Sequence, residues 1–409
     1  MSGGELLFEA PYLDNEINGK VISWWDKEQI RTFFNYDKGK KEGTHQWFYK
    51  DGTLERSAEY KKDLQVGEMK VWYPDGSLQA IQNFSEGRMV GEHRNYYPKK
   101  FAGQSDTDRL ASLFKYDENG ERHGEQITYY QNGSIQATLS YHRGEMDGKR
   151  IAYDPEGSII QETNYILGKL DGKHFEKTPD QREIVTYYKN NLKNGLHFAT
   201  YPADSKGEKI KAIEATFKDD LLEGPFKEYS ERGQIFAETV YAAGKKEGTS
   251  IIFSEDGTIS ITVEFFNDKQ NGMMVEFYPK SKGDNDENLG GNFKCGPVYR
   301  ETYFFDDMRE GEERTYHRNG NFASIFLYEN DRLSGLSQAW NEEGVLVFEA
   351  EYIDGLRHGK FRKYYDDGSP LLEQNFVSDI LEGEKKKYDK EGKLSVCNYE
   401  GGNLIKTTN

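Results

Sequence analysis

The sequence predicts an all-β protein, an elongated and curved single sheet built from about 15 tandem β-hairpins with a 24-residue period. Three observations predict it. Glycines recur at a fixed spacing, aromatic residues keep phase with them, and apolar and polar residues alternate between the turn signals. A fixed period in this range is typical of repeat architectures, in which each unit contacts mainly its neighbours.

The period is defined by fifteen glycines, called here the anchor glycines. Ten of the fourteen steps between them are 24 residues, and three of the other four, of 33, 29 and 39 residues, are longer. The anchor glycines are Gly19, Gly43, Gly67, Gly91, Gly124, Gly148, Gly172, Gly195, Gly224, Gly248, Gly272, Gly311, Gly335, Gly359 and Gly383.

Aromatic residues follow the anchor glycines at a constant distance. The residue five positions after the anchor is aromatic in thirteen repeats, called here the first aromatic series, and Lys177 and Thr200 are the exceptions. The series is Trp24, Phe48, Trp72, Tyr96, Tyr129, Tyr153, Tyr229, Phe253, Phe277, Tyr316, Trp340, Tyr364 and Tyr388. Large rings suit a thin sheet because each can bury about 150–250 Å² from one position.

Turn signals divide each repeat into two strands. Asp51-Gly52 is typical of the first signal and Gly39 of the second, and such residues supply the positive φ that tight hairpin turns need. We also place the anchor glycines at turn positions. Between the turns, apolar residues alternate with polar ones, as in 259–265, which indicates strands of about five to seven residues and argues against helix.

The organisation is a single array over residues 1–409 that begins with a half-repeat at 5–18. The three long steps carry insertions near 98–111, 202–211 and 279–298, each in place of the first turn of its repeat, so we expect three loops on one edge. Because open twisted sheets rarely exceed about ten strands without curling, we expect the sheet to be curved, with its aromatic face along a groove.

Composition excludes several classes of protein. The formal charge of −17 argues against binding to nucleic acid or anionic lipid, and no apolar run is long enough to span a membrane. The aromatic content of 14% is too high for a disordered chain. Two cysteines, Cys295 and Cys397, supply neither a disulfide framework nor a four-ligand zinc site. The charge favours a neutral or basic partner.

The segment from Tyr60 to Leu78 carries Asp63, Gly67, Trp72-Tyr73 and Asp75-Gly76 in a pattern that resembles the MORN repeat. It is most similar to the 24-residue variant found in bacterial antitoxin or immunity proteins of toxin–antitoxin modules. The resemblance covers nearly the whole chain. It implies a repeat protein that binds a cognate protein toxin. The eukaryotic form opens with Gly-x-Gly, whereas Gly43 is followed by Thr44-His45, which argues against a lipid-binding role.

No catalytic, cofactor or metal site is expected. The eight histidines lack ligand spacing, and the carboxylates recur in phase with the repeat, as a solvated sheet face would. The alternation of Asp284, Asp286 and Asn288 suggests a calcium loop, but Leu289 stands where an EF-hand needs glycine. We therefore interpret that segment as a mobile acidic loop, and the protein as a non-enzyme.

The candidate partner-binding residues lie one position after the first aromatic series. Five successive repeats carry an aromatic there, Trp25, Tyr49, Tyr73, Tyr97 and Tyr130, whereas most later repeats do not. If the first series forms the core, this second ladder lies on the opposite face, where exposed Tyr and Trp mark protein-binding surfaces. The alternative is that these rings hold their own turns or pack against neighbouring strands.

The leading hypothesis is an immunity protein or antitoxin that neutralises a toxin by direct binding, and the alternative is a structural or envelope-associated scaffold. The oligomeric state is left open. The cytoplasm is the default location, and a periplasmic or lipoprotein form is the alternative if an N-terminal signal was removed.

Overall fold

The computed structural model describes residues 7–99, 109–282, 287–288 and 294–408. These residues form strands and turns without an α-helix, so the all-β prediction is confirmed. No helix in the described part could cross a membrane. The chain divides into two compact units, Met1–Gly195 and Leu196–Asn409, and β20 (Leu192–Thr200) contains the boundary.

The first unit contains seven hairpins, each made of a first strand that carries the anchor glycine and a second strand. The first strands are β4 (Gly19–Trp24), β7 (Gly43–Phe48), β9 (Leu64–Trp72), β12 (Gly91–Tyr96), β14 (Gly124–Tyr129), β16 (Glu145–Tyr153) and β18 (Lys169–Lys177). The second strands are β5 (Ile30–Asp37), β8 (Leu54–Lys61), β10 (Leu78–Ser85), β13 (Leu110–Tyr116), β15 (Ile135–His142), β17 (Ile159–Ile166) and β19 (Glu183–Lys189). Short strands are β1 (Phe8–Glu9), β2 (Tyr12–Leu13), β3 (Glu16–Ile17), β6 (Lys40–Lys41) and β11 (Arg88–Met89).

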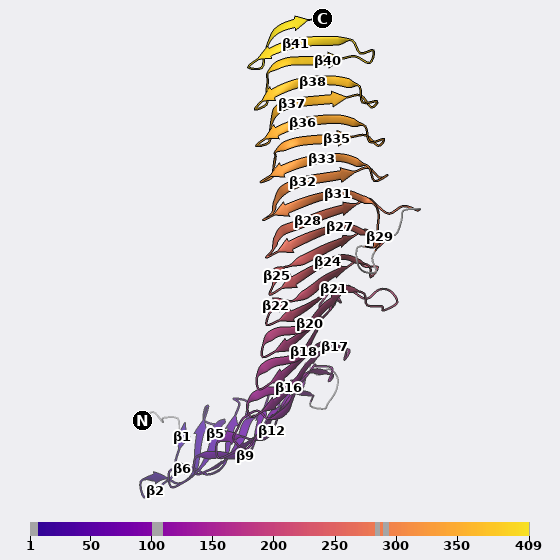
Figure 1. Cartoon of the computed structure of the whole chain (residues 1–409). Helices are drawn as coiled ribbons and strands as arrows, with labels where there is room; N and C mark the ends of the chain where they lie inside the picture. Colours follow the sequence, from indigo (N-terminus) through magenta and orange to yellow (C-terminus); the bar gives the residue numbers. More distant parts are fainter. Residues whose placement is uncertain (1–6, 100–108, 283–286, 289–293, 409) are drawn as a thin grey trace. The chain divides into compact units, whose positions relative to one another are not determined.

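The second unit repeats the same hairpin, and Figure 1 shows β31 to β41 following one another in file. Its first strands are β23 (Gly224–Tyr229), β26 (Gly248–Phe253), β28 (Lys269–Phe277), β32 (Met308–Tyr316), β35 (Gly335–Trp340), β37 (Leu356–Tyr364) and β40 (Gly383–Tyr388). Its second strands are β21 (Lys211–Lys218), β24 (Ile235–Ala242), β27 (Ile259–Phe266), β31 (Val298–Phe305), β33 (Phe322–Glu329), β36 (Leu346–Ile353), β38 (Pro370–Val377) and β41 (Leu394–Glu400), followed by β42 (Asn403–Thr408). Short strands are β22 (Leu221–Leu222), β25 (Lys245–Lys246), β29 (Glu287–Asn288), β30 (Lys294–Cys295), β34 (Arg332–Leu333) and β39 (Ile380–Leu381).

Strands consecutive in sequence pair antiparallel within each unit. In one hairpin, Gly43 lies opposite Tyr60 and His45 opposite Ala58, and β8 then pairs with β9. Strands of eight or nine residues are common, longer than the five to seven expected, and the nine-residue strands continue through the anchor glycine, as β9 does through Gly67.

The anchor glycines lie at bulges within the first strands or at their first residue, so their placement at turns was wrong. Between β17 and β18 the register shifts opposite Gly172, whose φ is +97°. A left-handed residue lets the chain absorb the extra residues without leaving the sheet. At Gly148 a Cβ would also come within 3.1 Å of the Ser140 Cβ. Glycine is therefore required there for backbone conformation and for space.

Both predicted turns are present. The first is tightened by its aspartate, as the Thr53 N–H donates to the Asp51 carboxylate at 2.9 Å. In the second, Lys62 and Asp63 both have positive φ, at 48° and 71°, which is the type I′ conformation that fits the twist of hairpins.

The interior is thin, and the first aromatic series forms less of it than predicted. Of the thirteen rings only Phe253 and Phe277 are buried, and the others are half-buried. The most buried position lies two residues after the anchor glycine and holds small or polar residues, among them Val21, His45, His93, Gln126, Ser250 and Ser337. No helix among the described residues covers the sheet, so both of its faces stay partly exposed to solvent. Most of the large aromatic rings are therefore only half-buried.

The insertions replace the first turn of their repeats, as predicted. The first lies largely outside the described residues. In the third, the described end packs back on the sheet: Cys295 pairs in parallel with Ile259 and is buried. It joins a small apolar cluster with Phe253, Ile259 and Phe277. Asp284, Asp286 and the side chain of Asn288, proposed as part of an acidic loop, lie outside the described residues.

Candidate functional site

The five predicted partner-binding residues stand just after the end of a first strand, and each is hydrogen-bonded to the next repeat. The Tyr49 hydroxyl donates to the Trp72 carbonyl at 2.9 Å, and Tyr73 donates to the Tyr96 carbonyl at 2.9 Å. Tyr97 and Tyr130 donate to the carbonyls of Tyr129 and Tyr153 at 2.6 and 2.7 Å, and Trp25 Nε1–H donates to the Phe48 carbonyl at 3.0 Å. The acceptor is always the backbone of the first aromatic series.

The same connection recurs in the second unit. Tyr201, Tyr278 and Tyr365 donate to the carbonyls of Tyr229, Tyr316 and Tyr388, and the His317 Nε2 lies 2.8 Å from the Trp340 carbonyl oxygen. We call this set the tyrosine ladder. Of the five predicted residues only Trp25 is exposed, and the four tyrosines are half-buried. The ladder thus fastens successive hairpins, while each of its five predicted side chains stays partly accessible, and partner binding by these residues stays a proposal.

Burial raises the pKa of the Tyr49 and Tyr73 hydroxyls above the usual value of tyrosine. The neutral phenol is therefore the form that the folded protein holds, and only this form can donate to a carbonyl oxygen. Trp25 is also covered on one side, since the Arg31 guanidinium lies 4.7 Å from its ring centre.

A second set of bonds fastens the hairpins at the opposite edge. The carboxylate of a second-turn aspartate accepts a backbone N–H of the preceding repeat at Asp63, Asp268, Asp307, Asp331 and Asp379. Asp63 accepts from Lys41 at 2.8 Å and Asp268 from Lys246 at 2.8 Å. In two repeats an arginine side chain joins in, with Arg309 Nε 3.1 Å from Asp331. These aspartates are structural, and their carboxylates are already used.

The buried histidines also have a structural role. His45 Nε2 lies 2.8 Å from the carbonyl oxygen of Asn35, which also accepts the Glu42 N–H at the bulge. Gln126 performs the same task, since both ends of its amide bond to the Lys115 backbone at 3.0 Å. Burial lowers the pKa of His45, which favours its neutral form. Among the described residues no group of three or more His, Cys, Asp or Glu is placed to hold a metal ion.

The sequence reasoning missed a row of exposed hydrophobic side chains that flanks the second turns of the second unit. We call it the apolar turn edge: Phe266, Phe305, Met308, Ile353, Leu356, Val377 and Ile380, with exposed fractions between 37% and 57%. Six of the seven face one another in three pairs, such as Ile353 with Leu356, and Phe266 lies opposite Lys269. The signal was present in the sequence as apolar residues six and three positions before the anchor glycine.

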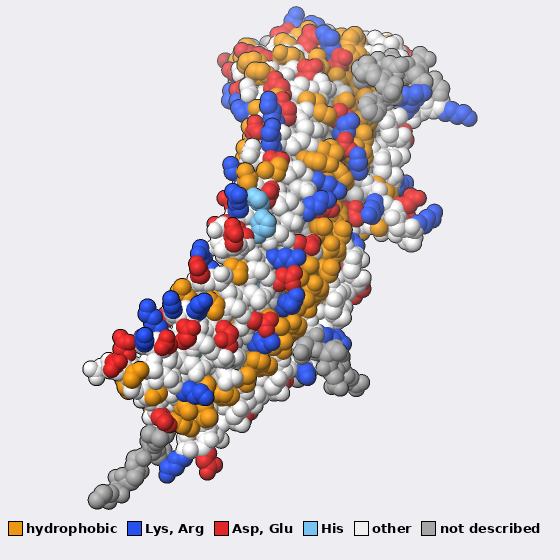
Figure 2. Space-filling view, turned by 90° about the horizontal axis from the view of Figure 1, so that it is seen from below, with side chains coloured by type: hydrophobic (Ala, Val, Ile, Leu, Met, Phe, Trp, Pro, Cys, Tyr) orange, Lys and Arg blue, Asp and Glu red, His pale blue; other side chains and the backbone are white. Residues whose placement is uncertain are grey.

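Hydrophobic side chains also gather into a stripe, with charged residues on either side, on the face seen in Figure 2. Contiguous exposed apolar surface of this kind marks a protein contact site more often than isolated exposed residues do.

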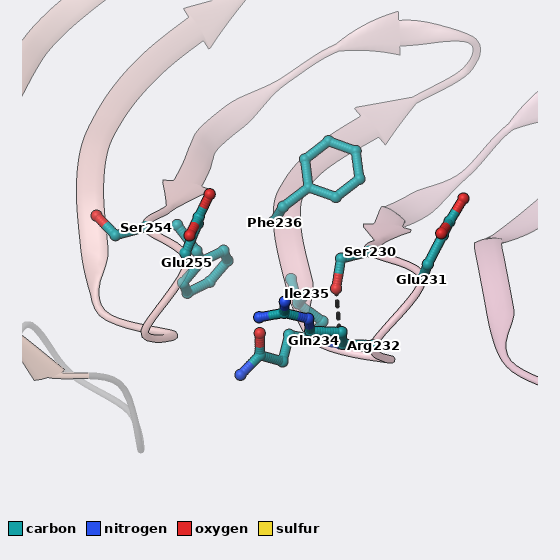
Figure 3. A pocket seen from close by; sticks show the side chains of 9 residues that line it. Ser230, Glu231, Arg232, Gln234, Ile235, Phe236, Ser254 and Glu255 are labelled. Atoms are coloured by element: carbon teal, nitrogen blue, oxygen red, sulfur yellow. Dashed lines mark hydrogen bonds between the residues drawn. The ribbon is translucent and has the colours of Figure 1, made fainter.

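The tyrosine ladder is interrupted in both units: Asp154 and Thr178 in the first, and Ser230, Ser254, Asn341 and Asp389 in the second, take the place of tyrosine. Ser230 and Ser254 are too short to cross to the next repeat, and the Ser230 hydroxyl instead accepts the Gln234 N–H at 3.3 Å. A pocket of about 300 Å³ opens between the two turns, lined by Ile235, Phe236 and Phe253 with polar residues around them (Figure 3).

Six segments of the chain match the family described as "MORN repeat variant", at residues 41–62, 65–86, 122–143, 146–166, 309–330 and 357–378. The chain carries MORN repeats. Each matched segment starts close to the second turn of one hairpin and ends close to the second turn of the next hairpin, so the matches follow the observed period. The match concerns the repeat and bears on no partner, so the antitoxin or immunity role stays a proposal.

No curated protein matches the chain in sequence. One solved structure, entitled "Crystal Structure of TcdB2-TccC3-Cdc42", is similar at 12% identity over 96% of this chain, with a TM-score of 0.14. This chain spans only 24% of that one. At such a TM-score the likeness carries no argument about fold or partner.

Proposed function

We propose that this MORN-repeat protein acts without catalysis, by binding another protein. The observation that carries the proposal is the apolar turn edge, where seven large hydrophobic side chains stand exposed beside four second turns, two on each side of the turn that carries Glu329 and Arg332. Rigid neighbouring strands hold these side chains in fixed positions, so a partner could bury them without ordering the surface first. Repeat arrays commonly use such an extended surface for binding.

The charge of the chain favours a neutral or basic partner. The formal charge is −17, which would attract a basic protein over distance and speed its association. Close to the edge the carboxylates are largely compensated: Asp379 lies 2.6 Å from Arg357 Nε and Asp306 lies 2.7 Å from Lys269 Nζ. Contact at the edge itself would therefore be mainly apolar. Added salt should lower the association rate constant more than it changes the dissociation rate constant.

The most concrete form of the proposal is an immunity protein that neutralises a cognate toxin. It rests on the resemblance that the sequence pattern at 60–78 suggests to the repeats of bacterial antitoxins, which the family match does not address, and on the acidic charge. The tyrosine ladder, through the accessible side of the rings from Trp25 to Tyr130, is a second candidate contact surface. A scaffold that organises assemblies is the competing function, for which the exposed Leu404 and Ile405 of β42 offer a further apolar contact.

The test is neutralisation of a candidate effector encoded beside this gene. Co-expression of the wild-type protein should restore growth of cells that make the effector. The quadruple change Ile353→Ser, Leu356→Ser, Val377→Ser and Ile380→Ser should abolish this rescue. The far-ultraviolet circular dichroism spectrum of the variant should stay unchanged, which shows that it still folds. The matched control is Glu329→Ser with Arg332→Ser, because these residues occupy the same paired positions in a repeat without apolar ones. Concentration-dependent self-association with no rescue would favour the scaffold instead.

A further inference from the structure

We propose that the pocket at the interrupted ladder receives an aromatic side chain, most specifically a tyrosine, from the partner polypeptide. The inference rests on the proposed protein-binding function and names one anchor for it. Equivalent positions in different repeats of the chain carry different residues. In the first unit the tyrosines follow a first strand and cross to the next repeat, whereas Ser230 and Ser254 leave this path open.

The pocket lies where the missing ring would be. Its lining comes from residues 230–236 and 253–255, which correspond in the repeat to 49–55 and 72–74. The latter two segments are those that Tyr49 joins through its bond to the Trp72 carbonyl. A tyrosine from another chain would therefore enter a space that the fold fills with its own tyrosine elsewhere.

The walls suit an aromatic ring. Phe253 is buried in the apolar cluster of the second unit, Ile235 packs against that cluster, and Phe236 stands exposed beside the opening (Figure 3). A ring placed among them would gain apolar contact and could meet Phe236 or Phe253 edge to face. A volume of about 300 Å³ is at the lower limit for ligand pockets, which favours one side chain over a larger molecule.

Polar residues of the pocket can hydrogen-bond to the hydroxyl of a bound tyrosine. The polar residues that line the pocket are Ser230, Glu231, Arg232, Gln234, Ser254 and Glu255. The carbonyl that corresponds to the ladder acceptor belongs to Phe253, and a carbonyl oxygen has two lone pairs with which to accept hydrogen bonds. A phenol is thus preferred over a purely apolar ring, because its hydroxyl has acceptors within reach of the ladder geometry.

The experiment uses p-cresol as the probe and the full-length protein. Ligand-observed NMR, together with the methyl resonances of labelled Ile235, should show weak binding to the wild type. Ser230→Tyr should reduce binding at least about tenfold, because it places the residue of the other repeats in the pocket. Ser230→Thr, which leaves the space open, should bind like the wild type. Toluene should bind more weakly than p-cresol, by about two- to tenfold for one net hydrogen bond.

Three results would overturn the inference: p-cresol that fails to shift Ile235, p-cresol that binds the Ser230→Tyr variant as well as the wild type, or a Ser230→Tyr variant that is less stable than the wild type. The last would show that a tyrosine does not fit. Assays with the partner protein distinguish a failure of this inference from a failure of the proposed function. If Ser230→Tyr neutralises a toxin as well as the wild type does, the pocket is not an anchor, although the proposed protein binding stands. If neither the wild type nor any variant binds a protein, the proposed function itself fails.

Discussion

Removing one ladder hydroxyl, in Tyr73→Phe, should weaken the contact between two neighbouring hairpins. The change deletes the 2.9 Å bond from Tyr73 to the Tyr96 carbonyl but keeps the ring, so no cavity forms. A net intramolecular hydrogen bond contributes about 0.5–1.5 kcal/mol to stability. Because the site is half-buried and water can reach the freed carbonyl in part, we expect a loss near 1 kcal/mol, rather than the penalty of about 1–3 kcal/mol for a fully buried orphan group.

Urea unfolding followed by tryptophan fluorescence is the appropriate assay. Four of the five tryptophans, Trp24, Trp25, Trp47 and Trp72, lie in the first three repeats, so the signal reports on the hairpins next to the change. The control is Tyr96→Phe, which leaves the acceptor carbonyl in place. A loss in Tyr73→Phe no larger than in Tyr96→Phe would refute the assignment of the ladder as a fastener.

Three further predictions concern pH and backbone. Because the pKa of His45 is lowered by folding, the folded state binds a proton at this residue less readily than the unfolded chain does. The contribution of His45 to stability should therefore be complete above pH 6.5 and fall as the pH drops below it. His45→Gln introduces the residue found at the equivalent position 126 and should reduce this loss in acid unfolding curves. Burial and the Glu301 carboxylate raise the pKa of Tyr316 to about 12, so its contribution should be complete below pH 10 and be lost as pH rises toward 12; the alkaline decline of the melting temperature should be shallower in Tyr316→Phe. Gly148→Ala should cost about 1–3 kcal/mol in urea unfolding because φ is +103° and the new methyl meets the opposite strand; a neutral effect would contradict the bulge geometry.

The period and the turns could be predicted from sequence because each has a local chemical signature. Asp-Gly at the first turn and alternation in 259–265 are readable from a few neighbouring residues, and the structure has a turn and a strand there. The anchor glycines were misplaced because positive φ is needed at a turn and at a bulge alike, and residue type alone does not distinguish the two.

Contacts between repeats were harder to predict than the repeats themselves. Nothing in the residue type of Tyr49 shows that its hydroxyl reaches a carbonyl 23 residues further along the chain. Likewise, the spacing of the histidines did not show that His45 is buried, and only the bulge explains why a polar side chain is needed in the interior. The apolar turn edge was visible as a pattern, but its exposure depends on how the strands pack.

The ladder joins a side chain of one hairpin to a main-chain carbonyl of the next, and every residue type has such a carbonyl. A duplicated hairpin therefore brings its own donor and its own acceptor, and can be inserted between two others without matching substitutions in either neighbour. A protein fastened in this way can lengthen by copying one unit, and a copy without the tyrosine, as at Ser230, stays joined to the next unit along its strands.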